Sequence, residues 1–192
     1  MNRHLRRLAW MFVLAAVYAL AGKAGLLLAI PPGYATAVWP PSGIAAAALL
    51  LGGLWLWPGV LLGSLAVNLW TSGDFSTSSA LIHSAMIAGG IGMGATLQAV
   101  LAASLVRMSV PHLNIFRLES DVVRLLMIAG PVACVVNATV GVATLFIAGL
   151  VPAESFLFNW WTWWIGDSIG VLVFLPLILI WDQRPYAQWW NK

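Results

Sequence analysis

The sequence predicts an all-α integral membrane protein, a helical bundle of about six membrane-spanning segments with both termini in the cytoplasm. Hydrophobic residues make up 61% of the 192 residues and charged residues only 8%, whereas soluble domains carry roughly 25% charged residues. The apolar residues form long runs, as membrane-spanning helices require. The few basic residues gather in alternate connections, which is the pattern that orients such helices. We therefore expect a single integral membrane domain over residues 1–192.

Six apolar segments make up the predicted bundle. A span needs about 20 apolar residues, so the second and third segments are short and are candidates for broken or partial spans. Irregular backbone at membrane depth is tolerated where protein or water covers it. The segments are 8–30, 37–51, 54–70, 80–106, 122–150 and 156–181.

The first two segments carry distinctive starts. Arginines precede the first, and the tripeptide ALA at 19–21 resembles a signal-peptide cleavage site. The apolar run continues past this site to Ile30, so we expect a retained first helix. The second segment opens with WPPSG at 39–43, and proline suits the first turn of a helix.

The connections predict one orientation. The connections 31–36, 72–79 and 151–155 contain no lysine or arginine. By the positive-inside rule the other side, including both termini, is cytoplasmic, and six spans satisfy that parity. The basic residues on that side are Arg3, Arg6, Arg7, Arg107, Arg117, Arg124, Arg184 and Lys192.

Small residues recur at a spacing that lets helix backbones approach closely. We interpret these G-x-x-x-G spacings as packing features within the chain, and a homodimer is an open alternative. Tryptophans near the segment ends are typical of an interfacial aromatic belt. The glycine pairs are Gly59 and Gly63, Gly90 and Gly94, and Gly166 and Gly170.

Two charges, Lys23 and Asp167, lie clearly inside the predicted spans. A charge at this depth costs about 3 kcal/mol or more on insertion scales. At 1.5 Å per residue, Lys23 lies roughly 10 Å and Asp167 roughly 16 Å from the outer ends of their segments. These depths are close enough to predict a buried ion pair or a shared polar cavity.

Other polar and aromatic residues in the same outer half predict a ligand pocket that opens away from the cytoplasm. Trp160, Trp164 and Asp167 share one face of the sixth segment by their helical spacing. Each candidate also has a structural interpretation: a register-fixing ion pair, an interfacial histidine or tryptophan belt, or interhelical hydrogen bonds from asparagines such as Asn137. The candidate ligand-binding residues are Trp39, Ser42, Asn68, His83, Trp160, Trp164 and Asp167.

No enzyme motif is present. The sequence has no P-loop, no zinc ligand set and no nucleophile elbow, and its basic residues follow topology and form no nucleic-acid patch. Its one cysteine, Cys134, lies in an apolar run and allows no intrachain disulfide. We therefore expect no catalysis, cofactor, metal or nucleic-acid partner.

Four stretches, in this order, resemble the first type of membrane-associated sensor domain of bacteria. The resemblance extends from about Tyr18 to Trp181, and the combination of W-P-P-S-G with W-W-x-G-D-x-x-G is its most specific part. The stretches are GKAGLLLA (22–29), AVWPPSGIAAAALLL (37–51), WPGVLLGSLAVNL (57–69) and NWWTWWIGDSIGVLVFLPLILIW (159–181).

The resemblance implies a sensory input domain in the bacterial inner membrane, of the kind found before histidine kinases and diguanylate cyclases. It implies about eight spans, two more than this chain carries, and this chain has no kinase or cyclase domain. It is therefore expected to be a minimal form or a piece of a longer protein, with its output passing through a partner or through further helices.

The favoured hypothesis is that a small extracytoplasmic or membrane-borne ligand binds in the outer pocket and shifts the packing of the sixth segment. A cationic ligand would pair with Asp167, an anionic one with Lys23, and a proton with Asp167 itself. Two other classes stay open, a small-solute transport component and a purely structural membrane module.

Overall fold

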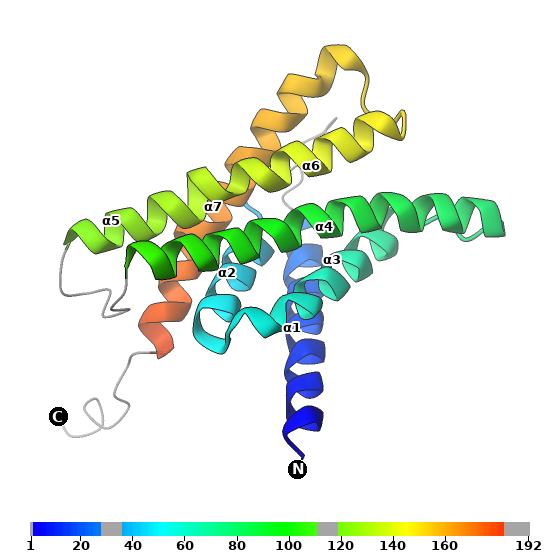
Figure 1. The fold of residues 1–192 in the computed structure, drawn as a ribbon. Coiled ribbons are helices and arrows are strands. Elements are labelled where there is room, and N and C mark those ends of the chain that lie inside the picture. Colours follow the sequence, from blue (N-terminus) through cyan, green and yellow to red (C-terminus); the bar gives the residue numbers. More distant parts are fainter. Residues whose placement is uncertain (1, 28–35, 111–118, 183–192) are drawn as a thin grey trace.

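The computed structural model describes residues 2–27, 36–110 and 119–182, which form a bundle of helices with short connections (Figure 1). The all-α prediction is confirmed. The predicted end of the first segment, Ile30, lies outside the described residues. The helices are α1 (Arg3–Leu26), α2 (Pro40–Gly52), α3 (Trp57–Ser72), α4 (Ser78–Ser109), α5 (Glu119–Met127), α6 (Ala133–Ile147) and α7 (Phe156–Asp182).

Short helical turns extend three of these helices. A 3-10 turn at Leu54–Leu56 precedes α3, and another at Ala153–Ser155 precedes α7. A π-helical turn at Ile128–Val132 joins α5 to α6. It contains Pro131, which has no N–H for the helical hydrogen-bond ladder, and a wider π turn accommodates such a break.

Among the described residues, five helical stretches are long and apolar enough to cross a membrane, and the chain is therefore a multi-pass membrane protein. The remaining predicted segment, the second one (37–51), corresponds to α2, whose 13 residues extend roughly 20 Å at 1.5 Å per residue. That is less than the roughly 30 Å of the hydrocarbon core, so α2 is a partial span. The five long stretches are Arg3–Leu26, Leu54–Ser72, Ser78–Ser109, Ser120–Ile147 and Ala153–Asp182.

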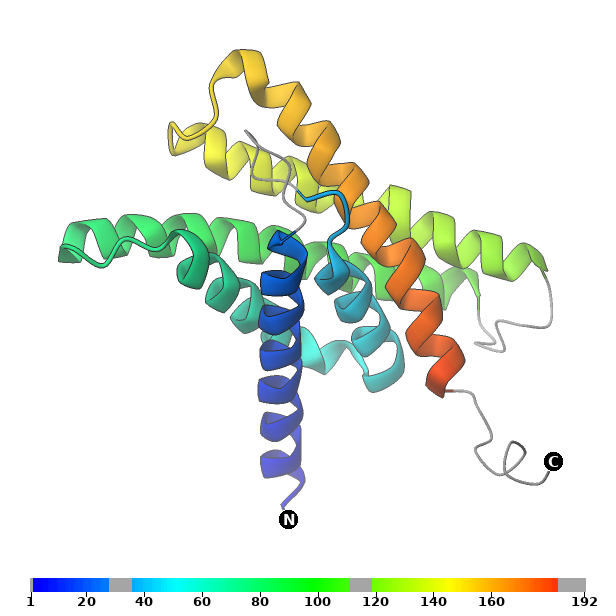
Figure 2. The ribbon, with the colours of Figure 1, turned by 180° about the vertical axis from the view of Figure 1, so that it is seen from behind.

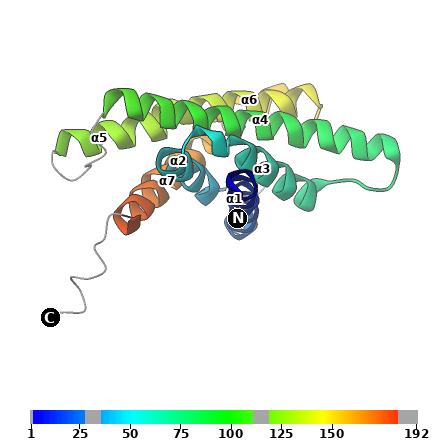
Figure 3. The ribbon, with the colours of Figure 1, turned by 60° about the horizontal axis from the view of Figure 1, so that its bottom comes forward.

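The helices form two layers. The helices α4 and α6 pack side by side in one layer, and α1, α2 and α7 lie on one side of it (Figure 3). Helix α3 packs on both α1 and α4 and so links the layers. Helix α2 lies between α1 and α7 (Figure 2) and also contacts α4. The partial span is thus covered by other helices on several sides.

The three G-x-x-x-G pairs all mediate packing within the chain, as predicted. A Cβ atom built on the α3 pair would meet backbone oxygens of α1, and one on the α4 pair would meet side chains of α6. The α7 pair faces backbone oxygens of residues 36–39, the segment that leads into α2. The pairs are Gly59 and Gly63 on α3, Gly90 and Gly94 on α4, and Gly166 and Gly170 on α7.

The C-terminal end of α2 is capped from another helix. The Nη2 atom of Arg107, on α4, donates to the carbonyl oxygens of Leu49 and Leu50 at 2.7 and 2.9 Å. The last carbonyls of a helix have no partner within the helix and carry a partial negative charge. The guanidinium therefore satisfies the end of α2 that falls short of a full span.

Replacing Arg107 by methionine is expected to lower the free energy of unfolding by about 2 kcal/mol, because two charge-assisted hydrogen bonds are lost. Unfolding of the detergent-purified protein, followed by tryptophan fluorescence, measures this. Arg107→Lys keeps the charge but has no planar fork to bridge two carbonyls, and should recover part of the loss. Equal stability of Arg107→Met and wild type would mean that the cap contributes nothing.

Candidate functional site

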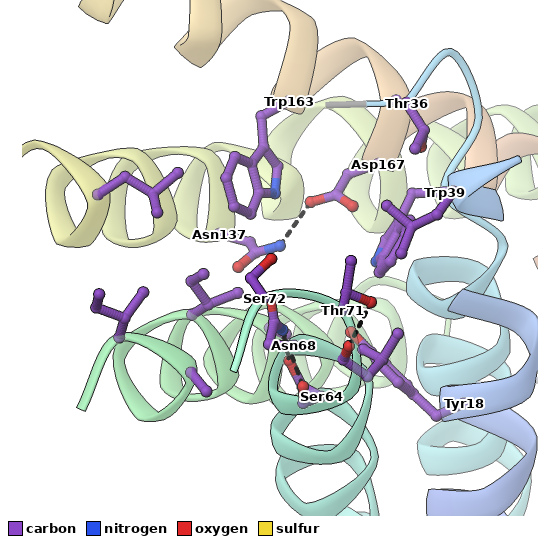
Figure 4. Close-up of a pocket in the computed structure, with 18 of the residues that line it drawn as sticks. Tyr18, Thr36, Trp39, Ser64, Asn68, Thr71, Ser72, Asn137, Trp163 and Asp167 are labelled. Atoms are coloured by element: carbon purple, nitrogen blue, oxygen red, sulfur yellow. Dashed lines mark hydrogen bonds between the residues drawn. The ribbon is translucent and has the colours of Figure 1, made fainter. Parts of the chain in front are cut away.

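A partly open cavity of about 280 Å³ lies among α1, α3, α4, α6 and α7, with the segment before α2 on one wall (Figure 4). At one end it reaches Ser72 and Gly73, beside the α3–α4 connection. Much of its lining is apolar, and polar and aromatic groups from several helices are set among the apolar ones. These groups include Tyr18, Trp39, Asn68, Asn137, Trp163 and Asp167.

The carboxylate of Asp167 is the central polar group of the cavity. The residue is only 1% exposed. Its Oδ2 atom accepts a hydrogen bond from Asn137 Nδ2 at 2.7 Å (Figure 4), whereas its Oδ1 atom has no hydrogen-bond partner. Burying a carboxyl oxygen without a hydrogen-bond donor costs free energy. A hydrogen-bond donor on a bound ligand would therefore stabilise the folded protein at this oxygen.

Asn137 holds this carboxylate from α6. Its amide nitrogen donates to Asp167, which places the amide oxygen on the side of Gly94 in α4. A Cβ atom at Gly94 would lie 2.7 Å from that oxygen, so glycine leaves the room that the side chain needs. Asn137 thus makes an interhelical hydrogen bond from α6 to α7, as expected for an asparagine in a membrane helix.

Trp39 and Ser42 lie at the junction between α2 and α7. Trp39 lines the cavity, and its backbone N–H donates to the carbonyl oxygen of Gly166 at 2.9 Å. Ser42 does not line the cavity. Its hydroxyl lies 2.8 Å from the carbonyl oxygens of both Trp39 and Asp167, so it joins the start of α2 to the backbone that carries the carboxylate.

The predicted tryptophans Trp160 and Trp164 do not line the cavity. Their rings stack with centroids 6.2 Å apart, and their indole nitrogens donate toward α6 and the π turn, to Thr139 Oγ1 and Pro131 O. The cavity instead contains Trp163, which the sequence interpretation missed. Trp163 precedes Asp167 by four positions and Trp164 by three, so helical spacing makes both neighbours of the carboxylate. Only the rotation of α7 against α6 decides which of them faces the cavity.

His83 is exposed on α4 and does not line the cavity. The cavity stripe of α4 consists of Ser84, Ile87, Ala88 and Ile91, which follow the spacing of one helix face. His83 lies one position off that stripe. Asn68 does line the cavity, and its Nδ2 atom donates to its own helix, at Ser64 O, over 2.8 Å.

Lys23 and Asp167 have different partners. The Lys23 ammonium donates to Thr71 Oγ1 at 3.3 Å and lies 4.9 Å from the centroid of the Trp70 ring. Within the described parts of the chain no ion pair joins Lys23 to Asp167, and Lys23 does not line the cavity. Counting residues from the segment ends places both charges in the outer half of their helices. It does not give the direction in which each side chain points.

Replacing Lys23 by methionine is expected to change the free energy of unfolding by no more than about 1 kcal/mol, as for a partly exposed charge. A buried ion pair that loses one partner costs about 3–5 kcal/mol, so the two arrangements are distinguishable. The measurement is chemical unfolding in detergent, with Lys23→Arg as the charge-preserving control. A loss of several kcal/mol in Lys23→Met alone would support the ion pair that the sequence predicted.

The comparisons with known proteins identify one family. The family model MASE1 matches residues 10–192, nearly the whole chain. No curated protein and no solved structure matches the chain.

Proposed function

The chain belongs to the MASE1 family of membrane-associated sensor domains, and from this membership we propose that it is a ligand-binding sensory input. In this proposal it lies in the bacterial inner membrane with both termini in the cytoplasm. A small extracytoplasmic or membrane-borne ligand binds in the cavity, and the output is a cytoplasmic histidine kinase or diguanylate cyclase. The observation that carries the proposal is the buried carboxyl group of Asp167, which belongs to the lining of a cavity among five helices and whose Oδ1 atom has no hydrogen-bond partner among the described residues.

The cavity has the composition of a small-molecule site. Such sites are mostly apolar, with a few placed polar groups that orient the ligand. Here Asp167 and Asn137 come from α7 and α6, while Tyr18 and Trp39 come from α1 and the segment before α2. A ligand that contacts these residues touches several helices at once, so its binding energy can depend on how those helices pack.

A route from the cavity to the other end of the bundle passes through α7 and the π turn. Trp164, one helical turn from Asp167, donates its indole N–H to Pro131 O at 2.8 Å. The π turn continues into α5, which lies at the opposite end of the α4–α6 layer from the α3–α4 connection (Figure 1). Single π turns within α-helices often occur at functional sites. A ligand favours one packing of the helices over another by its difference in affinity for the two packings. The contact between Trp164 and Pro131 would transmit such a change in packing to α5.

Filling the cavity tests the proposal. The detergent-purified chain is screened against a broad panel of small metabolites by thermal unfolding, since a ligand that binds the folded state raises its apparent stability. Ala88→Phe places a ring on the cavity wall and should abolish any shift. Ile82→Phe adds a comparable side chain at a residue that is 61% exposed on the same helix, and should keep the shift. A shift that survives in Ala88→Phe would place binding elsewhere, and the absence of any shift would argue against a ligand-binding input.

Transport is separated from sensing by a second measurement with the same ligand. Proteoliposomes that contain the chain and its output partner are mixed with radiolabelled ligand. Sensing predicts saturable binding without accumulation in the lumen. Accumulation that depends on the protein would favour the transport alternative.

A further inference from the structure

We propose that the cavity selects a small organic cation, a protonated amine, whose ammonium group donates a hydrogen bond to the free Oδ1 atom of Asp167. This inference rests on the proposed function because it names the chemical class of the ligand for the same site. Three features carry it: the charge of the lining, the unused acceptor, and the aromatic walls.

The charge of the lining favours a cation over an anion. Among the described residues that line the cavity, Asp167 is the only charged one. Lys23, the sequence's candidate partner for an anionic ligand, is not among the lining residues, and its ammonium is already engaged with Trp70 and with Thr71 at the edge of the lining. The stretch 28–35, which precedes the cavity wall at Thr36, contains no charged residue. An anionic ligand would therefore meet a buried carboxylate with no counter-charge, whereas a cation would supply the charge that a buried carboxylate requires.

The hydrogen bonding at Asp167 requires a donor. The Asn137 amide nitrogen donates to Oδ2 and the Asn137 amide oxygen is itself an acceptor, so in this arrangement neither atom supplies a hydrogen bond to Oδ1. The hydroxyl of Ser42 reaches the backbone oxygen of Asp167 and not the carboxylate. An ammonium N–H forms a short, charge-assisted hydrogen bond with a carboxylate. A quaternary ammonium ion has no N–H and could not satisfy this oxygen.

The walls suit an organic cation better than a bare metal ion. Trp163 and Trp39 lie on either side of the carboxylate, and Tyr18 lines the cavity farther from it (Figure 4); aromatic rings attract organic cations through their negative faces. The apolar lining at Val67, Ile87 and other aliphatic residues would remain uncovered around a single ion. The volume of about 280 Å³ lies at the lower end of the roughly 300–1,000 Å³ of ligand pockets, so the amine must be small.

A charge series on the full chain tests the inference. The probes are phenethylamine, its N,N,N-trimethyl analogue, the neutral 3-phenylpropanol and the anion 3-phenylpropanoate, each followed by thermal unfolding in detergent at constant ionic strength. Sodium and potassium chloride are compared in the same way. At a concentration far above its dissociation constant, phenethylamine should raise the melting temperature by at least about 3 °C, and the other probes by less than a third of that.

Two matched variants locate the effect. Asp167→Asn removes the charge and should lose the phenethylamine shift. Asp182→Asn makes the same change at the exposed end of the same helix and should keep it. If Asp167→Asn does not fold, the order of the probes on wild type still decides the charge class.

Each other outcome contradicts the inference in a distinct way. A larger shift with the neutral or anionic probe would overturn the cation assignment while leaving a ligand-binding cavity in place. A shift specific to sodium would assign the site to an inorganic ion. If the trimethyl analogue raised the melting temperature as much as phenethylamine does, the proposed hydrogen bond to Oδ1 would be contradicted, because the analogue has no N–H. No shift with any probe would contradict the amine site, and it would count against the proposed function only if the broad metabolite panel also fails.

Discussion

Gly170→Ala is expected to lower the free energy of unfolding by about 3 kcal/mol, the upper part of the range for overpacked sites. A Cβ atom at this position would collide with the backbone oxygen of Trp39 and also approach Ser42 Oγ at 2.6 Å. A backbone oxygen cannot turn aside as a flexible side chain can, so α2 would have to move away from α7. That movement would also weaken the hydrogen bond from Trp39 N to Gly166 O.

The measurement is unfolding in detergent by denaturant, with Gly89→Ala as the matched control. Gly89 also lies within a helix, and a Cβ atom there would meet nothing within 4 Å. Alanine is favoured over glycine in a helix by roughly 0.5–1 kcal/mol, so this control should be unchanged or slightly stabilised. Equal stability of Gly170→Ala and Gly89→Ala would contradict the close packing of α2 against Gly170 of α7.

Asn137→Leu is expected to lower the free energy of unfolding by about 3 kcal/mol, because it leaves the buried Asp167 carboxylate without its one described hydrogen-bond donor. Removing one partner of a buried polar pair costs the full desolvation of the group that remains, and more when that group is charged. Replacing both partners by apolar groups can be nearly neutral. The double variant Asn137→Leu with Asp167→Leu should therefore be more stable than Asn137→Leu alone.

A double-mutant cycle on the unfolding free energies measures this coupling, which we expect at about 1–3 kcal/mol. Asn68→Leu is the matched control, because the Asn68 amide donates only to its own helix, at Ser64. It should cost less than about 1 kcal/mol. Additive losses in the cycle would show that the carboxylate and the amide do not depend on each other.

The membrane architecture could be read from the sequence because composition and length decide it. Runs of apolar residues, the short second segment and the glycine spacings each reflect a local physical requirement, and the structure shows all three. The W-P-P-S-G start was predicted as a helix entry, and α2 begins at Pro40. Its packing against Gly166 and Gly170 could not be predicted, because no local pattern says which distant glycines a helix start will meet.

The candidate site was predicted only in part, because the sequence gives depth along a helix better than it gives rotation about its axis. Of the candidate ligand-binding residues, Trp39, Asn68 and Asp167 line the cavity. Trp163 and Trp164 are consecutive residues that differ by one step about the axis of α7, and polar spacing does not resolve which of them faces the cavity. Lys23 failed as the partner of Asp167 for a related reason. Its long side chain can point toward the interface, and there it meets Thr71 and Trp70.

The contact between α2 and α7 also has a consequence for the order in which the protein is assembled. Ser42 and Asp167, which this contact joins, are 125 positions apart in the chain. At a synthesis rate of about 5–20 residues per second, α7 would follow α2 from the ribosome after roughly 6–25 s. During that interval the N–H of Trp39 lacks its acceptor on α7 and the partial span lacks one of its covering helices. During synthesis α2 therefore remains without its full set of packing partners until α7 is made.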